Sequence, residues 1–158
     1  MKQLFKAILI LALFLNFTPQ TESNKYKCLI QMKNYKGEKA YVITSLIDAK
    51  GKYVNTLHIH GDDDEWYHEI SEWWKYFGKK KRNIDGISGA TIGGGERNVF
   101  LFQIDSKYFN QGYKIRFESS VEDQEYHVKD LEIPFDSTMM QGKIEGSGYI
   151  RYVRIMAN

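Results

Sequence analysis

The chain has 158 residues, of which 42% are hydrophobic and 15% aromatic, and its formal net charge at pH 7 is +2. This length fits one domain with an ample apolar core. A net charge this close to zero does not indicate binding to nucleic acid or to an anionic membrane. The single cysteine, Cys28, cannot form an internal disulfide. We therefore expect a domain that is stabilised by its core, with Cys28 as a buried and unreactive thiol.

The N-terminus predicts a secretory signal over residues 1–23. Lys2 and Lys6 precede an apolar run over residues 7–17 that is too short to cross a bilayer comfortably. Small residues favour cleavage after the last residue of this segment, and an uncleaved anchor is the alternative. Cleavage removes two lysines and one glutamate, which changes the net charge from +2 to +1. We expect a chain secreted across the inner membrane, with one domain over residues 24–158 in the periplasm or another extracytoplasmic space.

Short strand patterns dominate the rest of the chain. Apolar and β-branched runs bounded by turn residues predict about seven strands, over residues 27–32, 40–47, 53–60, 98–104, 113–121, 126–133 and 149–156. The second and third are joined by a turn at Asp48–Gly51 and form the clearest hairpin. Many short strands joined by turns predict a mainly β fold, an immunoglobulin-like antiparallel β-sandwich with one inserted α-helix.

That helix is predicted near residues 64–77, between the third and fourth strands. Apolar residues recur there at helical spacing, namely Trp66, Ile70, Trp73, Trp74 and Phe77. The aspartates at 62–64 suit its N-cap and Gly78 suits its C-terminus. Trp66 and Trp73 are predicted to be core residues, with a wall for an aromatic cofactor as the alternative. Trp74, about 100° around the helix from Trp73, is predicted to be partly exposed.

The segment that follows, near residues 84–97, contains the most specific pattern, from Asp85 to Thr91. Thr91 follows two residues with almost no side chain, Gly89 and Ala90, and three more glycines come shortly after it. The backbone around its hydroxyl is therefore expected to be thin and pliable. Asp85 and Ser88 have short polar side chains that we expect to bond to nearby backbone NH groups and fix a turn. The alternative is a glycine-rich connection in which Thr91 only caps a turn.

The residues Asp85-x-x-Ser88-Gly89-Ala90-Thr91 resemble the flavinylation motif D-x-x-(S/T)-G-A-(T/S), which the bacterial FAD:protein FMN transferase recognises. In proteins that carry this motif, the final hydroxyl residue becomes esterified to the phosphate of FMN. The resemblance therefore implies covalent FMN on Thr91, with the other four motif residues completing the cofactor-binding set. It also implies that the transferase is a partner of this chain.

Over about residues 41–135 the chain also resembles a family of small predicted periplasmic proteins. The shared features occur in the same order, as Gly61-Asp62-Asp63, Trp66, Trp73-Trp74 and Ser88–Thr91. The chain departs after Thr91, where it has an isoleucine and three glycines and relatives tend to have prolines before a glycine. The resemblance implies an extracytoplasmic electron carrier without catalytic residues, more a redox carrier than a stand-alone enzyme. Its expected electron donor is a membrane redox protein.

Two other functions fit particular residues. His58, His60 and Asp62 alternate at strand spacing and could share a face as zinc or copper ligands, although ordinary surface polarity is favoured and we expect no metal. A non-enzymatic exported β-sandwich that binds an envelope partner is the second alternative, and it predicts a sizeable exposed apolar patch. The basic run Lys79–Arg82 is favoured as a solvated stretch after the helix, with attraction to a phosphate or to an acidic partner as its alternative.

Overall fold

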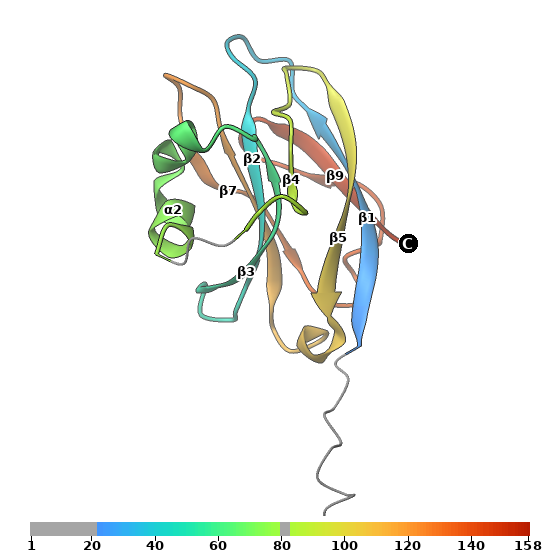
Figure 1. The fold of residues 1–158 in the computed structure, drawn as a ribbon. Coiled ribbons are helices and arrows are strands. Elements are labelled where there is room, and N and C mark those ends of the chain that lie inside the picture. The colour runs from blue at the N-terminus through green and yellow to red at the C-terminus, as the bar shows by residue number, and fades with distance from the viewer. Residues whose placement is uncertain (1–21, 80–82) are drawn as a thin grey trace, which may run out of the picture.

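The computed structural model describes residues 22–79 and 83–158. Two β-sheets pack face to face, one with strand order β5-β1-β9-β8 and the other with order β4-β3-β2-β6-β7 (Figure 1). The strands are β1 (Ser23–Met32), β2 (Tyr41–Ile47), β3 (Tyr53–His60), β4 (Ser88–Gly89), β5 (Arg97–Asp105), β6 (Lys114–Ser120), β7 (His127–Pro134), β8 (Ile144–Glu145) and β9 (Ile150–Ala157). The helical segments are η1 (Asp64–Glu69), α2 (Ser71–Phe77) and η2 (Ser106–Tyr108). The predicted mainly β sandwich is confirmed.

Each of the seven predicted strands corresponds to one of the long strands β1, β2, β3, β5, β6, β7 and β9. The two-residue strands β4 and β8 were not predicted, because two residues are too few to show an alternating pattern. The pairing of β4 with β3 is parallel, with Ser88 opposite Ile59 and Gly89 opposite His60. The pairings between the long strands are antiparallel, as predicted, and the short β4 is the parallel exception among the described strands.

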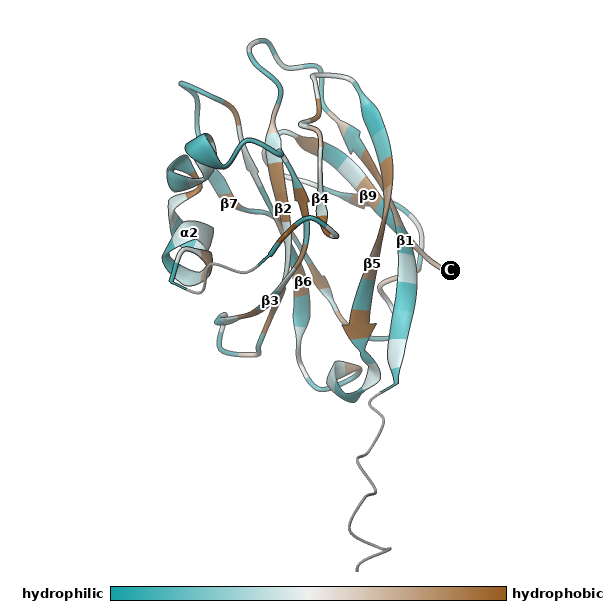
Figure 2. Ribbon diagram, viewed as in Figure 1, coloured by the Kyte–Doolittle hydropathy of each residue, from teal (hydrophilic) through white to brown (hydrophobic). Residues whose placement is uncertain are grey.

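Alternation along the strands builds the core between the two sheets, and apolar and polar residues alternate in Figure 2. In β1, Cys28 and Ile30 are fully buried, whereas Lys27 is exposed and Leu29 is half-buried. Burial raises the pKa of the Cys28 thiol far above its ordinary value, because the thiolate would lose its hydration there. Cys28 is thus a core residue, in agreement with the sequence prediction.

The helical insert covers the outer face of the five-stranded sheet, on the left in Figure 1. The insert is helical over the predicted range, but Ile70 (φ −82°, ψ 63°) breaks it in two, so that the first half is a 3-10 helix and the second half is the one α-helix of the described residues. The break lets Tyr67 and Ile70 of the first half join Trp73 and Phe77 of the second half against the sheet. Asp63 caps the first half by accepting a bond from the backbone NH of Glu65 (3.2 Å).

The three tryptophans of the insert have different surroundings. Trp73 is fully buried and its Nε1 donates to the hydroxyl of Thr56 on β3 (2.9 Å), which confirms it as a core residue. Trp74 is half-buried, as predicted. Trp66 is also half-buried, so the prediction that it belongs to the core is wrong. Trp66 lies on η1, before the break at Ile70, and so does not continue the buried stripe of α2.

The predicted signal over residues 1–23 lies almost entirely outside the described residues, and β1 begins at Ser23. Three of the four residues of the basic run Lys79–Arg82 also lie outside them. Within the ranges 22–79 and 83–158, no helix is long and apolar enough to span a bilayer.

Candidate functional site

Hydrogen bonds to β3 hold the first half of the motif segment. The backbone NH of Ile59 donates to the carbonyl of Ile87 (2.8 Å), and the NH of Gly61 donates to the carbonyl of Gly89 (2.6 Å). These bonds make β4 a short parallel edge strand beside β3. The motif is thus not a free loop, and its backbone is fixed up to two residues before Thr91.

A second anchor holds the chain immediately after Thr91. Ile92 and Ala40 form an isolated bridge, in which Ala40 N donates to Ile92 O (2.8 Å) and Ile92 N donates to Ala40 O (3.0 Å). The hydroxyl of Tyr35 accepts a bond from Ala40 N (2.8 Å) and donates one to Ile92 O (2.7 Å). Thr91 therefore lies between two hydrogen-bonded anchors, and its own side chain is half-buried.

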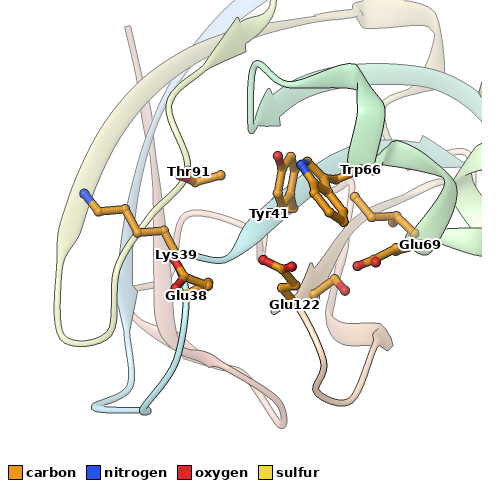
Figure 3. A pocket seen from close by; sticks show the side chains of 9 residues that line it. Glu38, Lys39, Tyr41, Trp66, Glu69, Thr91 and Glu122 are labelled. Carbon is orange, nitrogen blue, oxygen red and sulfur yellow. The ribbon is translucent and has the colours of Figure 1, made fainter.

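Thr91 lines a pocket of about 290 Å³ at the end of the sandwich beside the insert (Figure 3). The other lining residues are Glu38, Lys39, Tyr41, Trp66, Glu69, Ile70, Ser120 and Glu122. They come from the segment before β2, from β2 itself, from the insert and from the end of β6 and the residues after it. Thr91 is thus on the wall of a concave site and not inside a regular strand ladder.

Two aromatic side chains, Tyr41 and Trp66, form part of the pocket wall. The Tyr41 hydroxyl donates to the carbonyl of Asp63 (3.4 Å). Burial, together with the negative charges of Asp63 and Asp62, raises the pKa of Tyr41 to about 12, so the phenol is neutral at neutral pH. The pocket therefore offers flat aromatic surface that a planar ring system could contact.

The remaining charges at the pocket are mainly negative. Glu38, Glu69 and Glu122 line it, and Lys39 is the one cation among the lining residues. The Lys39 ammonium pairs with Glu96 (3.4 Å) and points away from Thr91 in Figure 3. The sequence did not reveal these glutamates as site residues, because they come from three separate segments that only the fold brings together.

Of the five predicted site residues, only Thr91 lines this pocket. Asp85 is exposed and Ser88 is half-buried, and the expected side-chain bonds from them to backbone NH groups are not found among the described residues. The side chain of Asn83 accepts from Asp85 N instead (2.9 Å), and the carbonyl of Ile84 accepts from the NH of Ser88 (3.0 Å). These bonds fix the backbone of the turn at Asp85 and Ser88.

The glycine run after Thr91 packs closely against the segment that contains Tyr35. A Cβ on Gly94 would lie 2.5 Å from the carbonyl oxygen of Tyr35. Gly95 has φ +75° and its NH donates to the carbonyl of Lys33 (2.9 Å). This turn therefore supports the segment that contains Tyr35, and Tyr35 in turn holds Ile92.

The candidate metal ligands do not gather. His58 and His60 face the sandwich interior with ring centroids 4.5 Å apart, and both pack against Phe100. Desolvation lowers the pKa of His58 to about 4 and that of His60 to about 3, so both rings are neutral at neutral pH. Asp62 and His68 are exposed. Among the residues with described positions, no three His, Cys, Asp or Glu side chains are close enough to hold a metal ion.

The fold and the pocket define a small β-sandwich protein with a helical insert over one sheet. Residues 23–152 match the model of a family described as predicted periplasmic protein (DUF2271), and the chain belongs to this family. This membership agrees with the extracytoplasmic location that the export signal predicts. No curated protein and no solved structure matches the chain.

Proposed function

We propose that this protein is an extracytoplasmic electron carrier with FMN esterified to Thr91. The observation that carries the proposal is the position of Thr91. Thr91, the last residue of the motif, lines a pocket of about 290 Å³ that Trp66 and Tyr41 also line. A residue that only capped a turn would not need a concave aromatic site beside it.

The residues present fit the cofactor. The volume is near the lower end of the roughly 300–1,000 Å³ typical of ligand pockets, so a bound ring would stay partly open to a redox partner. Trp66 and Tyr41 offer faces for an isoalloxazine ring, and Thr91 offers the ester oxygen. The bound FMN supplies one- and two-electron redox chemistry. The protein contributes position, partial shielding and an acidic environment from its glutamates.

Attachment needs a separate enzyme, which we propose is the FAD:protein FMN transferase. The Thr91 oxygen forms a bond to the FMN phosphorus of FAD, the pyrophosphate bond breaks, and AMP leaves. The hydroxyl proton passes to a base of the transferase. A covalent bond keeps the cofactor at a high local concentration outside the cytoplasm, where a dissociated flavin would be lost by dilution. A membrane redox protein would then supply the electrons.

Co-expression with the transferase tests this proposal. After export and denaturation, we expect the wild-type chain to retain yellow fluorescence and to gain the mass of one FMN less one water. Thr91→Ser keeps a hydroxyl and should still gain this mass, whereas Thr91→Ala should not. Thr138→Ala removes a threonine from an exposed turn far along the chain and should load normally.

Two results would overturn the proposal. A wild-type chain that gains no mass in the presence of active transferase is not a flavin acceptor. A Thr91→Ala variant that still gains the mass places the acceptor elsewhere. Circular dichroism of each variant checks that it is folded, so that a missing adduct is not caused by misfolding.

A further inference from the structure

The outer face of the four-stranded sheet combines cations with aliphatic side chains. The strand register places the outward-facing residues of this sheet in rows across β5, β1 and β9, which lie on the right in Figure 1. The rows are Leu101–Lys27–Met156, Val99–Leu29–Arg154 and Arg97–Gln31–Tyr152, with Lys25 beside Gln103 at one end. We call these residues the basic face.

The aliphatic part of this face is unusually exposed. Val99 and Leu101 are each 53% exposed, more than any other large hydrophobic residue among those described. They are neighbours on the outward side of an edge strand, and Leu29 lies next to Val99 on β1. Exposed aliphatic residues that gather on one face mark an interaction surface, whereas single exposed ones do not.

The cations of the basic face lack charged partners. Within the described part of the chain, no carboxylate forms an ion pair with Lys25, Lys27, Arg97 or Arg154. Arg97 donates only to neutral groups, the Gln31 side chain (3.0 Å) and the Tyr152 hydroxyl (3.3 Å). The acids beside this face are at its margins. Asp105 is paired with Lys107 (2.6 Å), Glu96 before Arg97 is paired with Lys39 (3.4 Å), and Glu145 lies on the far strand β8.

The opposite side of the molecule is acidic, which is why the net charge of the whole chain conceals the basic face. The insert on the other sheet carries Asp62, Asp63, Asp64, Glu65, Glu69 and Glu72. The cations of the basic face are therefore segregated from the carboxylates of the insert, although the other sheet also carries cations such as Lys114 and Arg116. The sequence argument against an anionic partner rested on the sum of charges and could not detect this segregation.

We propose that the basic face docks onto the anionic phospholipid surface of a membrane. Lysine and arginine side chains suit lipid phosphates, and aliphatic side chains between them suit the boundary of the acyl region. A flat sheet face with exposed valine and leucine fits a planar, fluid surface, whereas an acidic protein partner would call for shaped pockets and aromatic anchors. Lys25 and Lys27 also lie at the start of β1, within five residues of the predicted export signal. This inference does not depend on flavin attachment.

Vesicle co-sedimentation of the exported protein tests the proposal, with its N-terminus determined by mass spectrometry. We expect binding to vesicles that contain phosphatidylglycerol, little binding to pure phosphatidylcholine, and a decrease as salt is raised. The double substitution Lys25→Glu and Lys27→Glu should weaken binding at least about tenfold. Leu101→Ser should weaken the binding that remains at high salt, because it removes an aliphatic contact.

The matched control is the double substitution Lys50→Glu and Lys52→Glu. It makes the same change in net charge on an exposed turn of the other sheet, and it should leave binding within about twofold. Equal losses of vesicle binding in both double variants would overturn the proposal, because such losses would reflect the change in net charge alone. Absence of wild-type binding at low salt would also overturn it and would favour an acidic protein partner. Thr91→Ala should bind vesicles like wild type, which separates this proposal from flavin attachment.

Discussion

A Cβ atom on Gly61 would lie 2.0 Å from Cδ1 of Tyr41, far inside the contact distance of two carbon atoms. Gly61 also has φ +128°, a conformation that side chains rarely adopt. Its carbonyl accepts a bond from the hydroxyl of Tyr67 (2.7 Å), which ties it to the insert. This glycine therefore makes room for the ring of Tyr41 beside Thr91.

Gly61→Ala should lower the free energy of unfolding by about 2–4 kcal/mol, because it adds a clash to the backbone strain. Gly142→Ala is the matched control, since Gly142 has φ +116° but no atom within 4 Å of an added Cβ. Gly142→Ala should lower the free energy of unfolding by about 1–3 kcal/mol, from backbone strain alone. Urea unfolding of both variants measures the difference, and equal losses would show that Tyr41 moves aside without cost.

The buried carboxylate of Glu118 should contribute to the pH dependence of the free energy of unfolding. It is fully buried under the insert, and its carboxylate accepts bonds from the hydroxyls of Tyr53 (2.8 Å) and Tyr126. Desolvation raises its pKa from 4.5 to about 7 in spite of these bonds. Because Glu118 then binds more protons in the folded state than in the unfolded state, its contribution to stability should fall as the pH rises from about 4.5 to about 7, whereas His58 and His60, with lowered pKa values, contribute in the opposite direction.

Glu118→Gln should remove this contribution, so that the stability difference between wild type and Glu118→Gln should change by on the order of 3 kcal/mol across this range. Urea unfolding at pH values of about 4.5 and about 8 measures it. Glu65→Gln, which changes an exposed carboxylate of the insert, should keep the wild-type slope. A stability difference between wild type and Glu118→Gln that is the same at both pH values would mean that Glu118 ionises in the folded state as easily as in water.

Trp66 and Trp74 should differ in their effect on a loaded flavin, because only Trp66 lines the Thr91 pocket. An indole in contact with a flavin ring quenches its fluorescence, so Trp66→Ala should brighten the loaded protein. Trp74→Ala should leave the brightness close to wild type. Both tryptophans are half-buried, so their stability losses should be comparable. Similar brightness in the two variants would argue against contact between Trp66 and the ring.

Glu122 should lower the reduction potential of the loaded protein. Its negative charge lies on the pocket wall, so adding electrons beside it is less favourable. Glu122→Gln should raise the midpoint potential, on the order of tens of millivolts and less at high salt. Glu125→Gln, an exposed neighbour that does not line the pocket, is the control. A lower potential in Glu122→Gln would contradict the placement of the ring in this pocket.

The long strands could be predicted because their patterns are local. Alternation between the buried Cys28 and Ile30 and the outward Lys27 is visible in the sequence itself. The break at Ile70 could not be predicted in this way, because its side chain keeps helical spacing with Trp73 and is buried like it. The backbone turns at Ile70 in response to the sheet beneath it, and no cap or breaker residue in the sequence signals this turn.

The candidate site could be predicted only at Thr91. The hydroxyl is part of a local motif, whereas its neighbours Glu38, Trp66 and Glu122 reach the pocket from segments far apart in the chain. The roles expected for the Asp85 and Ser88 side chains stay predictions, and the described bonds show only that Asn83 and Ile84 accept from the backbone NH groups of these two residues. The local sequence pattern identifies Thr91 as the candidate acceptor, whereas the tertiary structure determines which residues surround it.

The two anchors on either side of Thr91 also limit how a cofactor there could work. β4 is bonded to β3 before the threonine, and Ile92 is bonded to Ala40 and Tyr35 after it. A group attached between two fixed points cannot travel like a swinging arm from one protein to another. Electron exchange with such a carrier requires each partner to come to the mouth of the pocket in turn.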